Sequence, residues 1–318
     1  MVELQVHELK GVNAPELRSQ VDLLLFQAFP CKTPQMDSED AITHSCLTAH
    51  PHTALSLPAI EALSVDPILF AQVPVLNTVL TKLISFIDAA PDELSKAELK
   101  QTLAQSMVPY LKTRFASTKA NSSLPSASKT SLVAWSKTTV TLVDALPVSE
   151  LFPLVDMWRL AILDPVVGTW CASTIAKPDT NPIFAFLTKA AWAVNNPASN
   201  SRNFILTMLR LLSNAFSSSD ITRQLLSDIP AAGEHVSPRS RTTDVLISTL
   251  LHENAAVRTA AASLVFNVAA YLQKGRVNKE RNPGADEEIV EDGDWEVELI
   301  SSVIEALGRE TGSEEVGP

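Results

Sequence analysis

The chain of 318 residues is 46% hydrophobic and 19% charged, a balance that excludes a disordered protein and allows one or two domains with a large core. Its net charge of −11 is concentrated, because eight of the 36 acids lie between positions 286 and 298, which leaves 28 acids against 25 basic residues elsewhere. No tract rich in lysine and arginine is present, so nucleic acid is not an expected partner.

The N-terminal part of the chain contains helical periodicity in separate stretches. The first predicted helix spans residues 15–29 and has proline in its first turn. The stretch 31–52 that follows is polar, contains prolines and has no periodicity, so we expect a surface loop there. Apolar residues at helical spacing resume over residues 76–87.

The next predicted helix opens with a capping box, in which the Ser95 and Glu98 side chains would satisfy each other's backbone amides. Pro109 is expected to kink or end that helix, because it lacks an amide hydrogen. A loop at residues 119–128 follows, and we place a boundary there. Residues 1–128 are accordingly predicted to be a helical lead-in to the main part of the chain.

The main part, residues 129–318, reads as a series of apolar helices joined by short turns. The predicted helices are 129–145, 150–163, 182–194, 201–217, 221–227, 242–252, 255–273 and 295–307. An acidic linker at 274–293 is expected before the last of them. No stretch alternates with a period of two, so the predicted fold is all-α, a stacked α-solenoid. The chain ends soon after an amphipathic helix, and we expect the solenoid to lack its C-terminal capping helices.

Two of these helices carry a repeated and costly feature. Asn214 and Asn267 each stand in an Ala- and Leu-rich helix that also contains an arginine. An asparagine in an apolar helix lowers helix propensity and leaves an amide to satisfy, so its repetition indicates use. One interpretation is an inner face that binds an extended peptide; the alternative is that both amides satisfy neighbouring helix ends in the core.

Residues 151–162, 203–216 and 254–267 resemble, in their order and spacing, the three signature helices of the PUL domain family. The resemblance covers residues 132–307 approximately. It implies an armadillo-like helical repeat whose groove binds the acidic, aromatic-containing C-terminal tail of the ubiquitin-selective AAA+ segregase. The basic residues of the signature helices match Arg159, Arg210 and Arg258.

Together with Asn214 and Asn267, these arginines form the predicted peptide-binding set. An asparagine can bond an extended backbone on both its donor and acceptor sides, and guanidinium groups suit carboxylates. The alternative for the arginines is that they are solvated charges or partners of nearby acids such as Asp156.

Residues 6–18 also look like the connector that follows a thioredoxin domain in fungal proteins joining a PPPDE peptidase, a thioredoxin domain and a PUL domain. Neither catalytic module is present in this chain, so their activities are not carried over. Compared with the family, residues 31–50 look inserted and the usual final helices after Glu315 are missing.

Catalytic and metal-binding interpretations have little support. Five residues invite a zinc hypothesis, but their spacing matches no usual zinc pattern: Cys31, His44, Cys46, His50 and His52. Cys171 with His235 or His252 resembles a thiol–base pair only in composition, since Cys171 lies in an apolar context that favours an inert thiol. The odd number of cysteines argues against a disulfide framework.

We therefore expect a non-catalytic adaptor without cofactor or metal, which binds the segregase tail in ubiquitin-dependent protein turnover. The absence of a signal region and of an uninterrupted apolar run of about 18 residues favours the cytoplasm or the nucleus, with no membrane partner. Two alternatives stay open. The chain is the targeting arm or a fragment of a peptidase–thioredoxin fusion, or it is a generic helical scaffold for another client.

Overall fold

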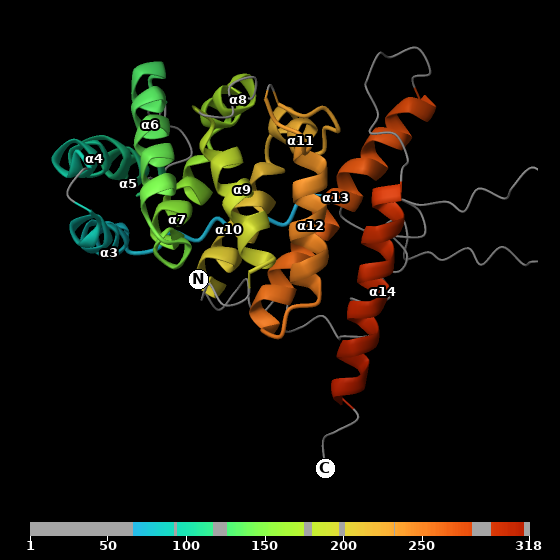
Figure 1. Ribbon diagram of the computed structural model, residues 1–318. Coiled ribbons are helices and arrows are strands. Elements are labelled where there is room, and N and C mark those ends of the chain that lie inside the picture. Colours follow the sequence, from blue (N-terminus) through green and yellow to red (C-terminus); the bar gives the residue numbers. More distant parts are fainter. Residues whose placement is uncertain are drawn as a thin grey trace, which may run out of the picture.

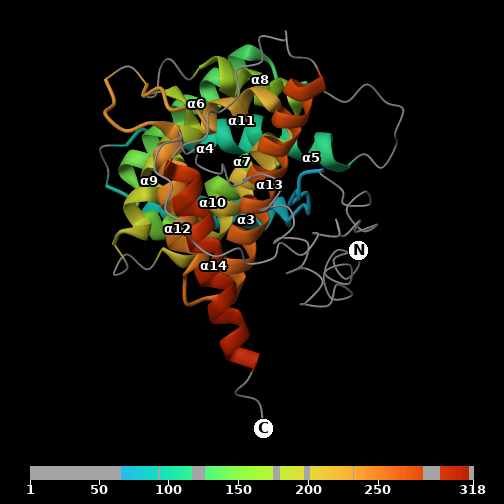
Figure 2. The same cartoon turned by 90° about the vertical axis from the view of Figure 1, so that its right-hand side faces the viewer.

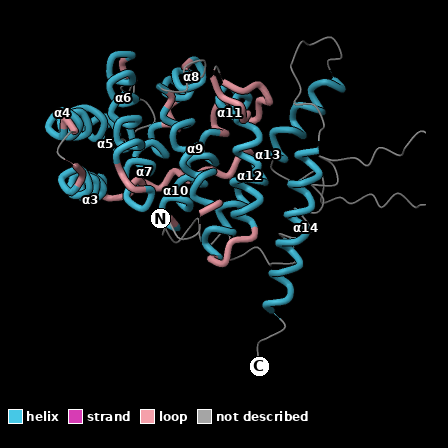
Figure 3. Tube along the Cα trace, in the orientation of Figure 1, coloured by secondary structure: helices cyan, strands magenta, loops and turns pink. Residues whose placement is uncertain are grey.

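In the computed structural model, the described residues are 66–91, 94–116, 126–174, 180–196, 201–231, 233–281 and 294–314. All regular structure within these ranges is helical, and the helices pack side by side from α3 at one end to α14 at the other (Figures 1 and 3). The predicted all-α solenoid is confirmed. The predicted helix at 15–29, the loop at 31–52 and its five cysteines and histidines lie outside the described residues.

The helices are α3 (Leu76–Ala89), α4 (Lys96–Thr102), α5 (Val108–Ala116), α6 (Lys129–Ala145), α7 (Phe152–Ala161), α8 (Pro165–Ser173), α9 (Pro182–Val194), α10 (Arg202–Ala215), α11 (Ser219–Leu225), α12 (Pro238–Leu250), α13 (Ala255–Arg281) and α14 (Asp294–Glu314). From α6 to α11 the predicted helices have bounds within two residues of the observed ones, whereas α8 was not predicted and α12, α13 and α14 differ more at their ends. Between α4 and α5 lies a π-helical turn, η2 (Leu103–Met107), and before α7 a 3₁₀ turn, η3 (Val148–Glu150).

Near α4, one local prediction was wrong and a second was wrong in part. The helix begins after Ser95 as expected, but the Ser95 side chain makes no capping hydrogen bond, so the capping box does not form. Pro109 does not end the helix, which continues through it into α5. The π-helical turn lies directly before this proline, and its altered hydrogen-bond pattern accommodates a residue that cannot donate an amide hydrogen.

Side-chain caps fix where several helices of the solenoid begin. Ser128 accepts a hydrogen bond from the Ser131 amide at the start of α6, and Asn181 accepts from the first amides of α9. Asp164 and Pro165 start α8, which the sequence reading missed because the helix is short and contains glycine.

One hydrophobic core runs through the solenoid, from Leu76 in α3 to Val303 in α14. Trp135 and Trp158 are both fully buried and meet edge to face, with ring centroids 6.5 Å apart. Trp170 is partly buried and packs against this core, whereas Trp192 is 52% exposed and lies outside it. Helices on both sides of the gap at 117–125 share this core.

The C-terminal end departs from the predicted linker. Residues 274–281 continue α13 as helix, and α14 begins at Asp294, so part of the predicted acidic linker is structured; residues 282–293 lie outside the described residues. Glu296 is buried rather than solvated and pairs with Arg276 at 3.1 Å. Figure 2, viewed from this end, shows α14 lying against the edge formed by α12 and α13.

Helix α13 is also long and apolar enough to cross a membrane over residues 255–279, with a mean hydropathy of 1.4. Here the sequence reading, which found no such stretch, was too strict. More than half of that window is buried inside the solenoid, where Val257, Leu264 and Val268 belong to the core. A core helix of this composition passes the same test, so the stretch is weak support for a membrane span.

Candidate peptide-binding face

An extended segment, residues 66–75, lies across three helices of the solenoid before the chain enters α3. In Figure 1 this segment is the blue trace that passes α13, α10 and α7. Pro67 and Pro74 keep it out of helical structure, because proline cannot donate the amide hydrogen that a helix interior needs. The segment places a peptide backbone on the face where the sequence predicted peptide binding.

Asn267 on α13 binds the backbone of this segment at Ile68. The Ile68 amide donates to Asn267 Oδ1 at 2.7 Å, and Asn267 Nδ2 donates to the Ile68 carbonyl at 3.0 Å. The same Nδ2 donates to the carbonyl of Ser213 at the end of α10, at 3.2 Å. A single amide side chain thus bonds an extended chain on both sides and also satisfies a neighbouring helix end.

Asn214 on α10 repeats this arrangement one helix further on. The Phe70 amide donates to Asn214 Oδ1 at 2.6 Å, and Asn214 Nδ2 donates to the Phe70 carbonyl at 3.1 Å. Its Nδ2 also donates to the Arg159 carbonyl at the end of α7, at 2.7 Å. Both asparagines are buried, at 0% and 1% exposure. Each satisfies a neighbouring helix end, and each also binds an extended backbone that belongs to the same chain.

Arg159 on α7 continues these backbone contacts toward α3. It is 5% exposed, its Nε donates to Asp156 Oδ1 at 2.6 Å, and its Nη2 donates to the Gln72 carbonyl at 2.9 Å. Its Nη1 donates to the Phe70 carbonyl. Asp156 compensates the buried charge and fixes the guanidinium plane, so that its outer edge binds the segment's backbone.

Arg210 lies on the same face, but no acceptor among the described residues binds it. The guanidinium lies 5.5 Å from the centre of the Phe70 ring, and its Nε is buried without a hydrogen-bond partner. Burial, followed by the positive charge of Arg159, lowers the pKa of Arg210, and the negative charge of Asp156 opposes this shift. Arg210 is thus a half-buried cation whose charge no carboxylate neutralises by direct contact.

Arg258 is the one predicted residue that the fold does not bring to this face. It lies in the first turns of α13, where its Nη1 donates to the carbonyls of His252 and Glu253 at 2.9 and 2.8 Å. Because it is nine positions from Asn267, it lies two and a half helical turns away, on the opposite side of the helix. We call the four residues that do face the segment the polar row: Arg159, Arg210, Asn214 and Asn267.

The PUL domain family matches residues 65–317, which is most of the chain. The chain belongs to the PUL domain family. PUL domains are protein-interaction domains and are not known to be catalytic. The match begins one residue before Asp66, so the segment 66–75 is part of the PUL domain. The match also includes residues 65–128, which belong to the stretch that we predicted as a helical lead-in. Neither curated proteins nor solved structures gave a match to the chain.

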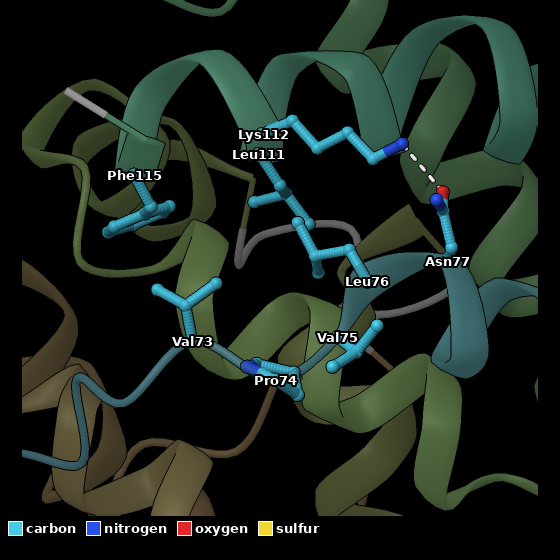
Figure 4. A pocket seen from close by; sticks show the side chains of 8 residues that line it. All are labelled: Val73, Pro74, Val75, Leu76, Asn77, Leu111, Lys112 and Phe115. Atoms are coloured by element: carbon cyan, nitrogen blue, oxygen red, sulfur yellow. Dashed lines mark hydrogen bonds between the residues drawn. The ribbon is translucent and has the colours of Figure 1, made fainter. Parts of the chain in front are cut away.

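A small pocket of the PUL domain lies where the segment enters α3. It measures about 280 Å³ and is lined by Val73, Pro74, Val75, Leu76, Asn77, Leu111, Lys112 and Phe115. Figure 4 shows that the apolar side chains surround it, while Lys112 Nζ donates to Asn77 Oδ1 at 2.6 Å on its rim. The lining offers no nucleophile and no acid–base pair.

Cys171, the cysteine considered as a nucleophile, lies at 0% exposure in α8. Burial raises the pKa of its thiol, which disfavours the reactive thiolate. Among the described residues, no group of three or more His, Cys, Asp or Glu side chains is placed to hold a metal ion.

The sequence did not predict that a segment of this chain binds to the polar row. The signal that could have indicated it is the apolar run Ile68-Leu69-Phe70, which lies between two prolines.

Proposed function

We propose that this PUL domain is a non-catalytic adaptor that binds the C-terminal tail of the ubiquitin-selective AAA+ segregase and connects it to ubiquitin-dependent protein turnover in the cytoplasm or nucleus. One observation carries the proposal. Three consecutive inner helices present two asparagines and two arginines on one face, and this face holds an extended peptide backbone. The choice of the segregase tail as partner comes from the family resemblance.

The charges of the polar row suit an acidic peptide. Asp156 forms an ion pair with Arg159, but no carboxylate among the described residues is hydrogen-bonded to Arg210, so the row keeps a positive charge that a peptide carboxylate can neutralise. A charge-assisted hydrogen bond contributes about 1.5–3 kcal/mol, roughly ten- to hundredfold in affinity. Arg258 lies apart from this row and is not needed for the same contact.

The test is fluorescence anisotropy of a labelled segregase C-terminal peptide titrated with the full chain at low and high ionic strength. We expect saturable binding that weakens with salt and falls at least tenfold in Arg210→Glu. Arg202→Glu is the matched control, because Arg202 lies on the same helix, carries the same charge and is exposed. Its binding should stay within twofold of wild type.

Two outcomes would contradict the proposal. Absence of binding by a folded, helical wild-type protein would remove the segregase tail as the partner and leave the alternative of a scaffold for another client. Equal losses in Arg210→Glu and Arg202→Glu would mean that the tail responds to net charge and not to the polar row.

A further inference from the structure

The occupant of the polar row belongs to the same chain, and it is held through its backbone. Every hydrogen bond from the row to the segment ends on a main-chain group of Ile68, Phe70 or Gln72. Because these groups are present in every peptide, the row does not require this particular sequence. Another extended peptide is able to make the same bonds.

The segment buries little apolar surface. Ile68, Leu69 and Phe70 are only partly buried, and Ala71, Gln72 and Val73 are exposed. Segments with few buried apolar contacts open locally at a lower free-energy cost than the core does. The cost of lifting residues 66–72 from the row is therefore set mainly by the backbone hydrogen bonds, which a replacing peptide restores.

With the segment bound, one polar group of the row, Arg210 Nε, has no hydrogen-bond partner. Arg210 contacts the Phe70 ring, but its buried Nε has no acceptor, and residues 68–72 contain no acid. A peptide that supplies a carboxylate here gains a charge-assisted bond that the segment does not make. This difference favours an acidic peptide over the chain's own segment.

We propose that residues 66–72 are an intramolecular ligand of the polar row, and that the row also binds, in place of them, an extended peptide whose acidic side chain pairs with Arg210. The proposal rests on the function proposed above, since the segregase tail is the expected competitor. The tethered segment has the advantage of high effective concentration, on the order of millimolar for short connections. The free domain therefore holds its site covered until an acidic peptide is present.

The first experiment opens the site in the full chain. Ile68→Pro/Phe70→Pro removes both amide hydrogens that Asn267 and Asn214 accept, without changing the row. Leu69→Pro/Ala71→Pro is the matched control, because the amides of Leu69 and Ala71 make no hydrogen bond. The probe is a fluorescein-labelled peptide with the sequence of residues 64–75.

We expect the opened variant to bind this probe at least tenfold more tightly than wild type or the control pair do. Adding Asn214→Leu to the opened variant should abolish the binding. Equal affinities in the opened variant and wild type, with helical content intact, would overturn the proposal. If the double-proline chain does not fold, Phe70→Ala weakens the segment while it keeps the backbone bonds, and the same comparison applies.

The second experiment tests the preference for an acid. Side chains two positions apart in an extended chain point to the same side, so position 72 follows Phe70 on its face. A probe with Gln72→Glu differs from the first probe only in charge. We expect it to bind the opened variant at least fivefold more tightly, and this advantage should disappear in Arg210→Gln. An unchanged advantage in Arg210→Gln would overturn the pairing with Arg210.

Titration with the segregase tail peptide then separates the two proposals. If the opened variant binds the probes but no tail peptide, the intramolecular ligand stands and the segregase partner falls. If the tail binds wild type and the opened variant equally and is insensitive to Asn214→Leu, the tail uses another surface. In that case the proposed function stands and displacement of residues 66–72 is overturned.

Discussion

Asn214 and Asn267 combine two tasks that are usually separate. Each buried amide completes the hydrogen bonding of a neighbouring helix end and also binds one residue of the extended segment on both its donor and its acceptor side. Burying an asparagine that makes all of these hydrogen bonds costs little free energy. An apolar replacement leaves the carbonyl of the adjacent helix buried without a hydrogen-bond partner. The asparagine side chain therefore serves both the stacking of the helices and the attachment of the chain's own segment 66–75.

Asn214→Leu should lower the free energy of unfolding by about 1–3 kcal/mol, because the buried Arg159 carbonyl and the Phe70 amide lose their partner. Chemical denaturation followed by circular dichroism measures this change. Asn195→Leu is a suitable control, since Asn195 is exposed at the end of α9. A loss equal to that of the control would show that the amide of Asn214 does not support the helix end.

Tyr110 gives a second residue-level prediction. Its hydroxyl donates to Asp164, the residue that caps α8, and burial followed by this hydrogen bond raises the pKa of Tyr110. Above about pH 10 the unfolded state loses the phenolic proton while the folded state keeps it, so stability falls as pH rises. Tyr110→Phe should show a flatter decline above pH 10 in denaturation experiments; parallel curves for the two proteins would contradict this assignment.

A residue's role could be predicted from the sequence where the residue recurs at matching places, and could not where it depends on a contact distant in sequence. The two asparagines recur at matching places in two helices, so the sequence alone indicated that their amides are used, either for an extended peptide or for neighbouring helix ends. The difference between Arg159, which has a carboxylate partner, and Arg210, which contacts an aromatic ring, was not predictable. Arg159 pairs with Asp156, three residues away in the same helix, whereas the contact of Arg210 depends on where Phe70 lies. Phe70 is distant in sequence, and no local pattern reports that contact.

At the scale of elements, helix existence was easier to predict than helix ends. The bounds of α6 and α9 agree with the predicted ones, because a polar cap precedes each apolar run. α12 begins at Pro238, four residues before the predicted start, since Ser237 caps it and no apolar stripe marks the first turn. α13 continues beyond the predicted end because residues 274–281 lose apolar periodicity but are mostly lysine, arginine and glutamate, which favour a helix and offset Gly275.

The docking of α14 depends on a buried ion pair at its first turn. Glu296 is 4% exposed and accepts both hydrogen bonds from Arg276 Nη2 on α13, while Trp295 stacks on Arg239 of α12 at 5.6 Å. Removing Glu296 takes away the carboxylate that Arg276 contacts in this buried position, and losing one partner of a buried pair costs more than the intact pair contributes.

Glu296→Ala should therefore loosen α14 before the rest of the solenoid. We expect amide exchange in α14 to accelerate at least tenfold, while α7 and α10 stay protected, as measured by hydrogen exchange and mass spectrometry. Glu305→Ala is the matched control, because its pair with Arg309 on the same helix is half exposed. Equal exchange rates in α14 for both variants would argue against this anchoring role.

The whole molecule combines a continuous helical core with a non-helical segment laid across it. The core runs from α3 to α14, and the family match includes the segment as well as the helices. Helix periodicity predicts the solenoid, but the position of an extended segment depends on contacts across 144 and 199 residues of sequence. Its presence changes the interpretation of the site, because the polar row already binds the chain's own segment, and a partner peptide that uses the row, as we propose, would replace that segment.

The most direct test of this account is amide exchange measured residue by residue by NMR in the full chain, with and without saturating segregase tail peptide. Without peptide, we expect the amides of Ile68 and Phe70 to exchange slowly and those of Leu69 and Ala71 to exchange fast. Peptide should abolish the protection of Ile68 and Phe70. Fast exchange at all four amides without peptide would contradict the bound segment, and unchanged protection in the presence of bound tail would contradict its replacement.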